Sequence, residues 1–182
     1  FKSLTFSPIP SKNIKYDKLF HLPFVADRIK KKFYKKKEKI KILIISKFQK
    51  RKNIIFAFNI LDYLHTKFSF EVTFIGEVSS KENKKIFQSL KEKIINSEHN
   101  SKYEIYKNIP FNQMRSFYNK SDIFLLASSD EPASVSILEA MSYGLSVICS
   151  DTCSTKSYLP KKKNNIFKSE NSEDLIKCLK FY

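Results

Sequence analysis

Two glutamates, Glu131 and Glu139, stand eight residues apart in a long stretch of the chain that contains no lysine or arginine. The stretch lies between Lys120 and Lys156 and covers 35 residues, where the average of 34 basic residues in 182 would place about six or seven. Acids are nevertheless retained there, so charge as such is not excluded. Carboxylates without basic neighbours in sequence are available to accept hydrogen bonds from the hydroxyl groups of a ligand.

Glu139 is the more unusual of the two, because its helix is otherwise made mostly of small or apolar residues. The residues three and four positions away on either side are uncharged, so the helix offers no local ion pair. A carboxylate on such a buried helix is costly unless a hydrogen-bond donor satisfies it. Two vicinal hydroxyls of a ligand can do so; the alternatives are a distant backbone group or a lysine from another loop.

Glu131 stands where a predicted strand gives way to a helix, and Pro132 is predicted to occupy the first turn of that helix. Free backbone amides and the helix dipole favour an anion at such a point. Glu131 is therefore a candidate ligand-binding carboxylate. The alternative is an ordinary acid that stabilises the dipole in a first turn.

Strands and helices alternate from residue 40 onwards, and this order predicts the fold class. The predicted strands are apolar runs at 40–46, 70–75, 103–106, 122–127 and 146–149. The predicted helices cover 53–66, 80–97, 112–119, a segment that ends at 143, and 173–181. Apolar strands that alternate with helices indicate an α/β fold, a doubly wound Rossmann-like parallel sheet with helices on both faces. Ligands of such sheets bind beyond the carboxyl ends of the strands.

Residues 1–39 differ from the rest, with three prolines, no sustained period and a basic run at 30–37. We expect this segment to be a linker or a peripheral basic segment, and residues 40–182 to form one domain. The net charge of +16 favours an acidic partner: nucleic acid, anionic lipid or a phosphate-bearing small molecule. Much of the excess can equally reflect the composition of an AT-rich genome.

The cysteine pattern argues against a disulfide framework or a structural metal site. Cys149, Cys153 and Cys178 are an odd number with no C-x-x-C spacing, and the three histidines lie far from them in sequence. We expect reduced thiols in a cytoplasmic protein and no metal. The apolar runs are too short to span a membrane, and no signal peptide is visible, although the chain opens at Phe1 rather than methionine.

The segment from Glu131 to Glu139 resembles the E-x7-E motif of the retaining glycosyltransferases with the GT-B architecture, family 4 in particular. Further stretches resemble that family in the same order as the predicted elements. They are the strand and basic loop of 41–53, Ile75-Gly76, the segment 108–124, and 139–151 with its E-A-M-x-x-G-x-x-V tail. The resemblance covers about residues 40–182 and implies the C-terminal, donor-binding domain of such an enzyme.

The resemblance implies a role for each residue that matches the family's motifs. Lys47 and Lys52 would bind the donor diphosphate and balance its charge. Relatives usually carry arginine at the position of Lys47. Glu131 would accept hydrogen bonds from the donor sugar, and Glu139 from the ribose hydroxyls. The remaining contacts would be made by backbone, at Ile109 to the nucleobase and near Ala133, Ser134 and Val135 to the diphosphate.

The implied donor substrate is a nucleotide-diphosphate sugar, with no cofactor and no metal. The implied acceptor is a glycan or a lipid-linked molecule of surface polysaccharide synthesis. Such an acceptor suits a cytoplasmic protein and allows peripheral contact with the inner face of an anionic membrane. The acceptor domain would belong to a longer chain or to a partner subunit. The chain departs from the family at Ser134, at 152–155 and at 164–165, where relatives carry glycine.

A different function class is also open: a non-catalytic basic α/β module that binds nucleic acid or an acidic surface. Phe33 and Tyr34 lie among the lysines of 30–39, and such interleaving suits base stacking and phosphate contact. A solvated surface explains the same run. The glycosyltransferase reading predicts no nucleic-acid partner, so nucleotide binding separates the two hypotheses.

Overall fold

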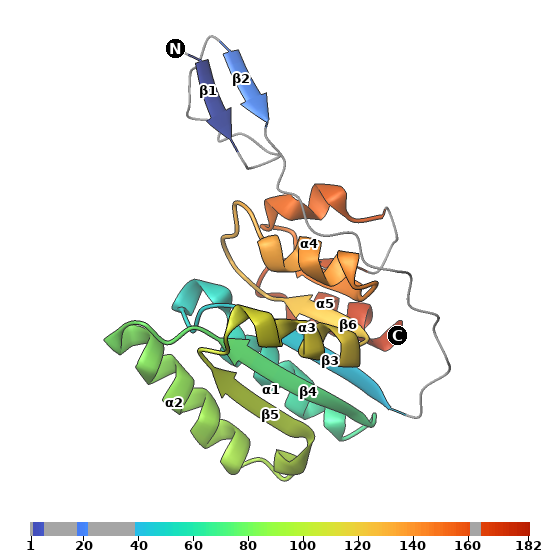
Figure 1. Ribbon diagram of the computed structural model, residues 1–182. Helices are drawn as coiled ribbons and strands as arrows, with labels where there is room; N and C mark the ends of the chain where they lie inside the picture. Colours follow the sequence, from blue (N-terminus) through green and yellow to red (C-terminus); the bar gives the residue numbers. More distant parts are fainter. Residues whose placement is uncertain (1, 6–17, 22–38, 161–164) are drawn as a thin grey trace.

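The computed structural model describes residues 2–5, 18–21, 39–160 and 165–182 (Figure 1). Two short strands, β1 (Lys2–Thr5) and β2 (Lys18–His21), pair in parallel with each other. The division of the chain at residue 39 stays a prediction. The basic run at 30–37 lies outside the described residues. The described chain resumes at Lys39 and enters the main sheet at Ile40.

The main sheet has six parallel strands in the order β5-β4-β3-β6-β7-β8. These strands are β3 (Ile40–Ile45), β4 (Phe70–Gly76), β5 (Tyr103–Lys107), β6 (Ile123–Leu126), β7 (Ser146–Ser150) and β8 (Ile166–Phe167). All five predicted strands are present, and the predicted fold class is confirmed. The sequence did not predict β8, because two residues are too short to show a period.

The strand order reverses between β3 and β6, which lie side by side in the middle of the sheet. The chain moves outward from β3 through β4 to β5, then returns to the other side of β3 and continues through β6 to β8. In an open α/β sheet the loops that follow the two strands at such a point diverge and leave a crevice. The loops after β3 and β6 are therefore the natural positions for a site.

Helices cover both faces of the sheet (Figure 1). They are α1 (Ile54–His65), α2 (Lys81–Ile95), α3 (Phe111–Lys120), α4 (Val135–Ser142) and α5 (Ser172–Lys180), with 3-10 turns η1 (Lys50–Lys52), η2 (Asn100–Lys102) and η3 (Ser154–Tyr158). Alternate residues of β3 enter the two cores: Ile42 and Ile44 pack with α1, α2 and α5, and Leu43 packs with α3 and α4. No helix of the described residues is long and apolar enough to cross a bilayer.

The helix starts differ in how they are capped. Ser80 caps α2, since its Oγ accepts from the Asn83 amide at 3.1 Å. The prediction that Pro132 lies in the first turn of α4 is wrong, because α4 begins at Val135, where the Ser134 hydroxyl accepts from the amide of Ile137. Asn53, with which the predicted helix 53–66 begins, directly precedes α1; its backbone is left-handed (φ 49°) and its side chain makes no capping bond.

Candidate nucleotide-sugar site

A buried ion pair joins the loop after β3 to the loop after β6. The Nζ of Lys52 contacts the Oε2 of Glu131, and both side chains are at most one-tenth exposed. The loops are also joined by backbone, because the amide of Ser129 donates to the carbonyl of Arg51 at 2.7 Å. Lys52 and Glu131 were both candidate site residues from the sequence, and they lie 79 positions apart. The fold brings them into contact where the strand order reverses.

Arg51 is a member of this site that the sequence analysis did not single out. Its guanidinium donates to the carbonyl of Asp130 and lies 3.8 Å from the Oε2 of Glu131. Its side chain is nearly half exposed, so its guanidinium is open to solvent as well as close to Glu131. The available signal was its place beside Lys52 in the basic loop, one of only three arginines in the chain.

The backbone of Glu131 is held from the opposite side by the segment after β7. Glu131 and Cys153 form a parallel β-bridge, and the amide of Ser154 donates to the Glu131 carbonyl at 2.9 Å. The hydroxyl of Ser128 lies 3.4 Å from Oε2. Glu131 is therefore fixed four residues before α4, in an extended segment rather than in a first helical turn.

A cleft of about 570 Å³ opens at the carboxyl ends of β3, β4 and β5, and we call it the β3–β5 cleft. Its lining includes Ser46, Lys47, Gly76, Glu77, Ile109 and Ser136. The structure thus brings Lys47 and Ile109, which were predicted to contact phosphate and base, to one cleft. Lys47 is half exposed and pairs with Glu77 at 2.9 Å. Hydrogen bonds from Ser79 and from Lys47 lower the pKa of Glu77.

The floor of this cleft requires a glycine at position 76. A Cβ there would lie 2.3 Å from the carbonyl oxygen of Ser46 and 2.6 Å from the Phe48 ring. Asn108 fixes the neighbouring wall, since its left-handed backbone (φ 53°) lets its side chain bond both the amide and the carbonyl of Val78. The cleft is therefore built by the close approach of three loops.

The start of α4 carries the residues that were predicted to face a diphosphate through their backbone. Ser134 is buried, Ala133 is half-buried and Val135 is exposed. The Ser134 amide donates to the Thr155 hydroxyl at 2.8 Å, so it must leave Thr155 to reach a diphosphate. The Ser134 hydroxyl caps the helix and lies 3.0 Å from the hydroxyl of Ser136.

Glu139 is half-buried, one turn further along α4, and its carboxylate is hydrogen-bonded to a tyrosine. The hydroxyl of Tyr118 donates to Oε2 at 2.6 Å. Within the described residues Glu139 forms no ion pair and does not line the β3–β5 cleft. The structure therefore joins Glu131 to Lys52 and places Lys47 with Ile109, but it joins Glu139 to neither lysine.

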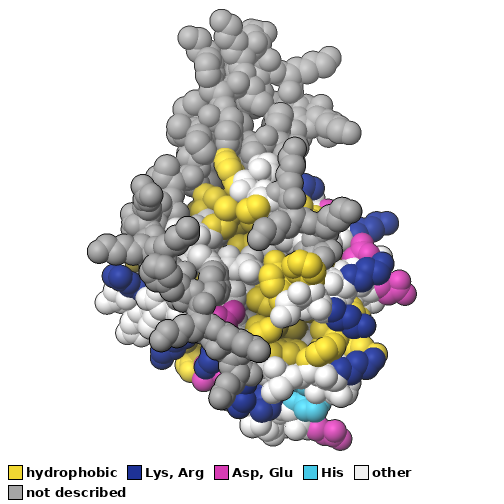
Figure 2. Space-filling model, turned by 90° about the vertical axis from the view of Figure 1, so that its right-hand side faces the viewer, with side chains coloured by type: hydrophobic (Ala, Val, Ile, Leu, Met, Phe, Trp, Pro, Cys, Tyr) yellow, Lys and Arg dark blue, Asp and Glu magenta, His cyan; other side chains and the backbone are white. Residues whose placement is uncertain are grey.

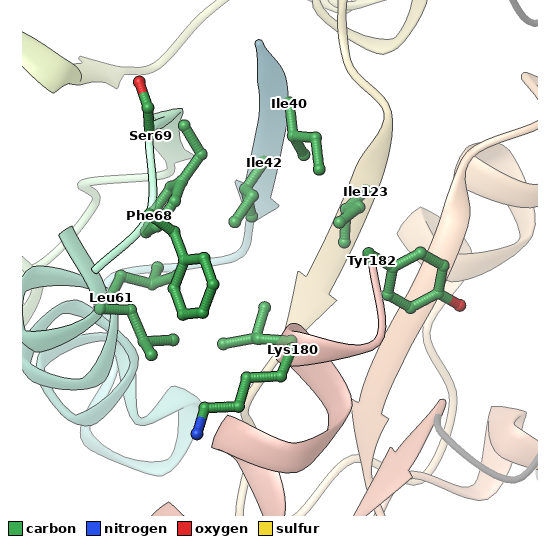
Figure 3. A pocket seen from close by; sticks show the side chains of 11 residues that line it. Ile40, Ile42, Leu61, Phe68, Ser69, Ile123, Lys180 and Tyr182 are labelled. Carbon is green, nitrogen blue, oxygen red and sulfur yellow. The ribbon is translucent and has the colours of Figure 1, made fainter. Parts of the chain in front are cut away.

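The opposite end of the sheet has a hollow of a different kind, which we call the amino-end hollow. It has a volume of about 330 Å³ and is lined largely by apolar side chains, including Ile40, Leu61, Phe68 and Ile123 (Figure 3). Hydrophobic side chains gather on this side of the molecule, with lysine and arginine towards its edge (Figure 2). The hollow offers few polar groups for a nucleotide.

The three cysteines lie among the described residues and were considered as metal ligands. Cys149, Cys153 and Cys178 are buried free thiols. In the described part of the chain, no three histidine, cysteine or acidic side chains gather as they would around a metal ion.

A sequence model of the family described as "Glycosyl transferases group 1" matches residues 25–181, which is most of the chain. The chain belongs to the group 1 glycosyltransferases. This membership confirms the prediction, made from the sequence, that the chain is part of a glycosyltransferase. A comparison with curated proteins gave no match.

Solved structures share the fold of this glycosyltransferase domain. A glycosyltransferase from Rickettsia africae ESF-5 superposes with a TM-score of 0.70 at 20% identity, over 80% of this chain and 38% of its own. Sucrose-phosphate synthase from Thermosynechococcus elongatus gives 0.70 at 13%, over 79% and 36%. An E. coli structure described as "Trehalose-6-phosphate … bound with UDP-2-fluoro glucose" gives 0.68 at 12%, over 78% and 36%. The chain therefore spans less than two-fifths of the length of these proteins.

Proposed function

We propose that this domain binds the nucleotide-sugar donor of a retaining, family 4 GT-B glycosyltransferase, of which it is the C-terminal half. The observation that carries the proposal is the buried Lys52–Glu131 pair where the strand order reverses. Lys47, from the same loop as Lys52, lines the β3–β5 cleft. A buried ion pair is expensive in desolvation and is therefore weak as a device for stability alone. A ligand that offers both negative charge and hydroxyl groups satisfies both partners.

A nucleoside-diphosphate sugar is such a ligand. As the sugar leaves, negative charge grows on the diphosphate and must be balanced by cations fixed in advance. In our proposal Lys52 and Lys47 turn from their glutamates to the phosphates, and Glu131 accepts hydrogen bonds from the sugar. The UDP-2-fluoro glucose of the similar E. coli structure supports a donor of this class. Glu139 takes the ribose hydroxyls, and the Ile109 backbone meets the base.

The transfer itself needs parts that lie beyond this domain. Orienting an acceptor against the donor requires a second wall, and the solved glycosyltransferases of this fold are well over twice as long as the matched part. We propose that an acceptor domain, in a longer chain or in a partner subunit, presents a glycan or lipid-linked acceptor of surface polysaccharide synthesis at the cytoplasmic side of a membrane. The departing phosphate then takes the acceptor's proton, without a metal.

A thermal-shift experiment with UDP, GDP and ADP tests donor binding. One nucleotide at a hundredfold its Kd is expected to stabilise the fold by about 2.7 kcal/mol, or about 5–10 °C in Tm. Glu139→Gln should reduce this shift, whereas Glu92→Gln on the exposed face of α2 should not. Salt-sensitive binding of single-stranded nucleic acid without stabilisation by any nucleotide would contradict the proposal and favour the basic binding module.

A further inference from the structure

The hydrogen bond between Tyr118 and Glu139 connects two helices that are far from each other in sequence. Tyr118 belongs to α3 and Glu139 to α4, and the hydroxyl-to-Oε2 distance is 2.6 Å. Tyr118 is the buried residue of α3, with a relative exposure of 2%. We propose that Tyr118 is a positioning residue, which holds the Glu139 carboxylate in the orientation that receives the donor ribose. This inference rests on the proposed donor-binding function.

The ring of Tyr118 is buried and packs against two further aromatic rings, which restrict the position of its hydroxyl. It stacks on Tyr143 with centroids 5.0 Å apart and planes inclined by 6°, and its centroid lies 6.5 Å from that of Phe124 on β6. Phe124 is fully buried. A hydroxyl on such a packed ring can favour one rotamer of the Glu139 carboxylate, because the surrounding side chains restrict movement of the ring.

The protonation state of Tyr118 favours the same direction of hydrogen bonding. Burial, together with the bond to the Glu139 carboxylate, raises the pKa of Tyr118. The phenol therefore stays protonated and donates, while the carboxylate accepts. Because a carboxylate has two oxygens, occupation of Oε2 by the phenol leaves Oε1 to accept from a ribose hydroxyl. In the described residues no hydrogen bond to Oε1 is present.

The positioning role of Tyr118 and a role in packing alone depend on different parts of its side chain. A packing role needs only the aromatic ring, whereas a positioning role needs the hydroxyl and acts only on ligands that carry ribose hydroxyls. A carboxylate whose rotamer is already fixed loses less side-chain entropy when the ligand binds. This saving corresponds to about a three- to tenfold change in affinity. The expected effect is thus a loss of discrimination between ribose and deoxygenated ribose, rather than a general loss of binding.

The test measures Kd by calorimetry for the best of UDP, GDP and ADP and for its 2′,3′-dideoxy analogue. Wild-type protein should prefer the ribonucleotide. Tyr118→Phe, which keeps the ring stack, should weaken the ribonucleotide about three- to tenfold and leave the dideoxy analogue unchanged. Tyr143→Phe is the matched control, because it removes a hydroxyl from the adjacent ring of the same stack, and it should leave both constants unchanged.

Glu139→Gln provides a second variant that does not depend on the folding of Tyr118→Phe. If Tyr118 holds the oxygen of the new amide, the NH2 group faces the ribose and can only donate to a hydroxyl oxygen, so the charge-assisted bond is lost and the preference for ribose should fall. A preference for ribose equal to that of the wild-type protein would overturn the inference.

The remaining outcomes separate this inference from the proposed function. No binding of any nucleotide by wild-type protein overturns both. Equal affinity of wild-type protein for the two sugars overturns the role of Glu139 and hence of Tyr118, but leaves donor binding intact. An equal loss for both nucleotides in Tyr118→Phe shows that Tyr118 acts only through packing, and overturns the positioning role alone.

Discussion

The two ends of the parallel sheet are built from the same strands but carry opposite kinds of residue. At the carboxyl ends, Lys47, Ser46 and Ser136 line the β3–β5 cleft, and the buried Lys52–Glu131 pair joins the loops that follow β3 and β6. At the amino ends, the hollow is lined by apolar residues such as Leu61 (Figure 3). Loops at the carboxyl ends lead into helix N-termini, where anions are stabilised. Among the described residues, the charged and polar groups that suit a ligand therefore gather at the carboxyl ends of the strands, whereas the hollow at the amino ends is largely apolar.

The largest effect is expected from breaking the buried pair. Lys52→Met leaves the buried Glu131 carboxylate with Arg51, at 3.8 Å, as its cationic neighbour, and should lower the free energy of unfolding by about 3 kcal/mol. Urea unfolding measures this loss. The double variant Lys52→Met, Glu131→Gln removes both charges and should recover most of it. Equal losses in the single and double variants would show that the stability does not depend on the pairing of the charges.

A second substitution tests the amino end. Leu61 on α1 is fully buried and lines the amino-end hollow, so Leu61→Ala should cost about 2–4 kcal/mol of unfolding free energy through lost packing. The Kd for nucleotide should stay at its wild-type value when measured well below Tm. A change in Kd that exceeds the loss of folded protein would show that the two ends are coupled.

The pH dependence of stability should come largely from the amino end as well. Burial and the neighbouring His99 lower the pKa of His65 to about 4, and its ring stacks on Phe70 at 3.9 Å. The unfolded chain, with a pKa near the ordinary 6.5, takes up the proton first. Stability should therefore be complete above pH 6.5 and decline as the pH falls towards 4.

The urea midpoint measured between pH 7 and pH 4.5 checks this dependence. His65→Phe, which keeps a ring against Phe70, should flatten the profile over that window. An unchanged slope in the variant would assign the acid sensitivity to other groups.

The smallest effect is expected from the exposed pair at the cleft. Glu77→Gln removes the ion pair of Lys47. Nucleoside diphosphate should then bind about two- to threefold more tightly, because Lys47 no longer has to leave the Glu77 carboxylate to contact the phosphates. Glu71→Gln is the matched control: it removes the partner of Lys41 from an equally exposed pair near the amino end of β3. If both variants tighten binding alike, the gain reflects net charge rather than Lys47.

The sequence allowed the order of elements and the fold class to be predicted, because long apolar strands and amphipathic helices repeat along residues 40–182. The start of α4 was misplaced, since a proline suits a first turn but the Ser134 hydroxyl provides the cap. Lys52 and Glu131 were both singled out, and their contact depends on loops that the topology brings together. Their roles, and those of the other site residues, stay predictions.

Contacts between elements were beyond the reach of the sequence. The spacing of Tyr118 and Glu139 in the sequence does not show that the Tyr118 hydroxyl contacts Glu139. The residues of α4 likewise did not indicate which side chain donates a hydrogen bond to the Glu139 carboxylate. The bond from the Ser134 amide to Thr155 likewise depends on how the segment after β7 folds back. Such contacts follow from tertiary packing rather than from periodicity.

A crystal structure of the domain with the stabilising nucleoside diphosphate tests the central claim most directly. Our account predicts diphosphate oxygens within hydrogen-bonding distance of Lys52 Nζ, at the junction of the β3 and β6 loops, with the base against the backbone of Ile109. A nucleotide seated elsewhere, with the lysine still held by Glu131 and the cleft vacant, would contradict it.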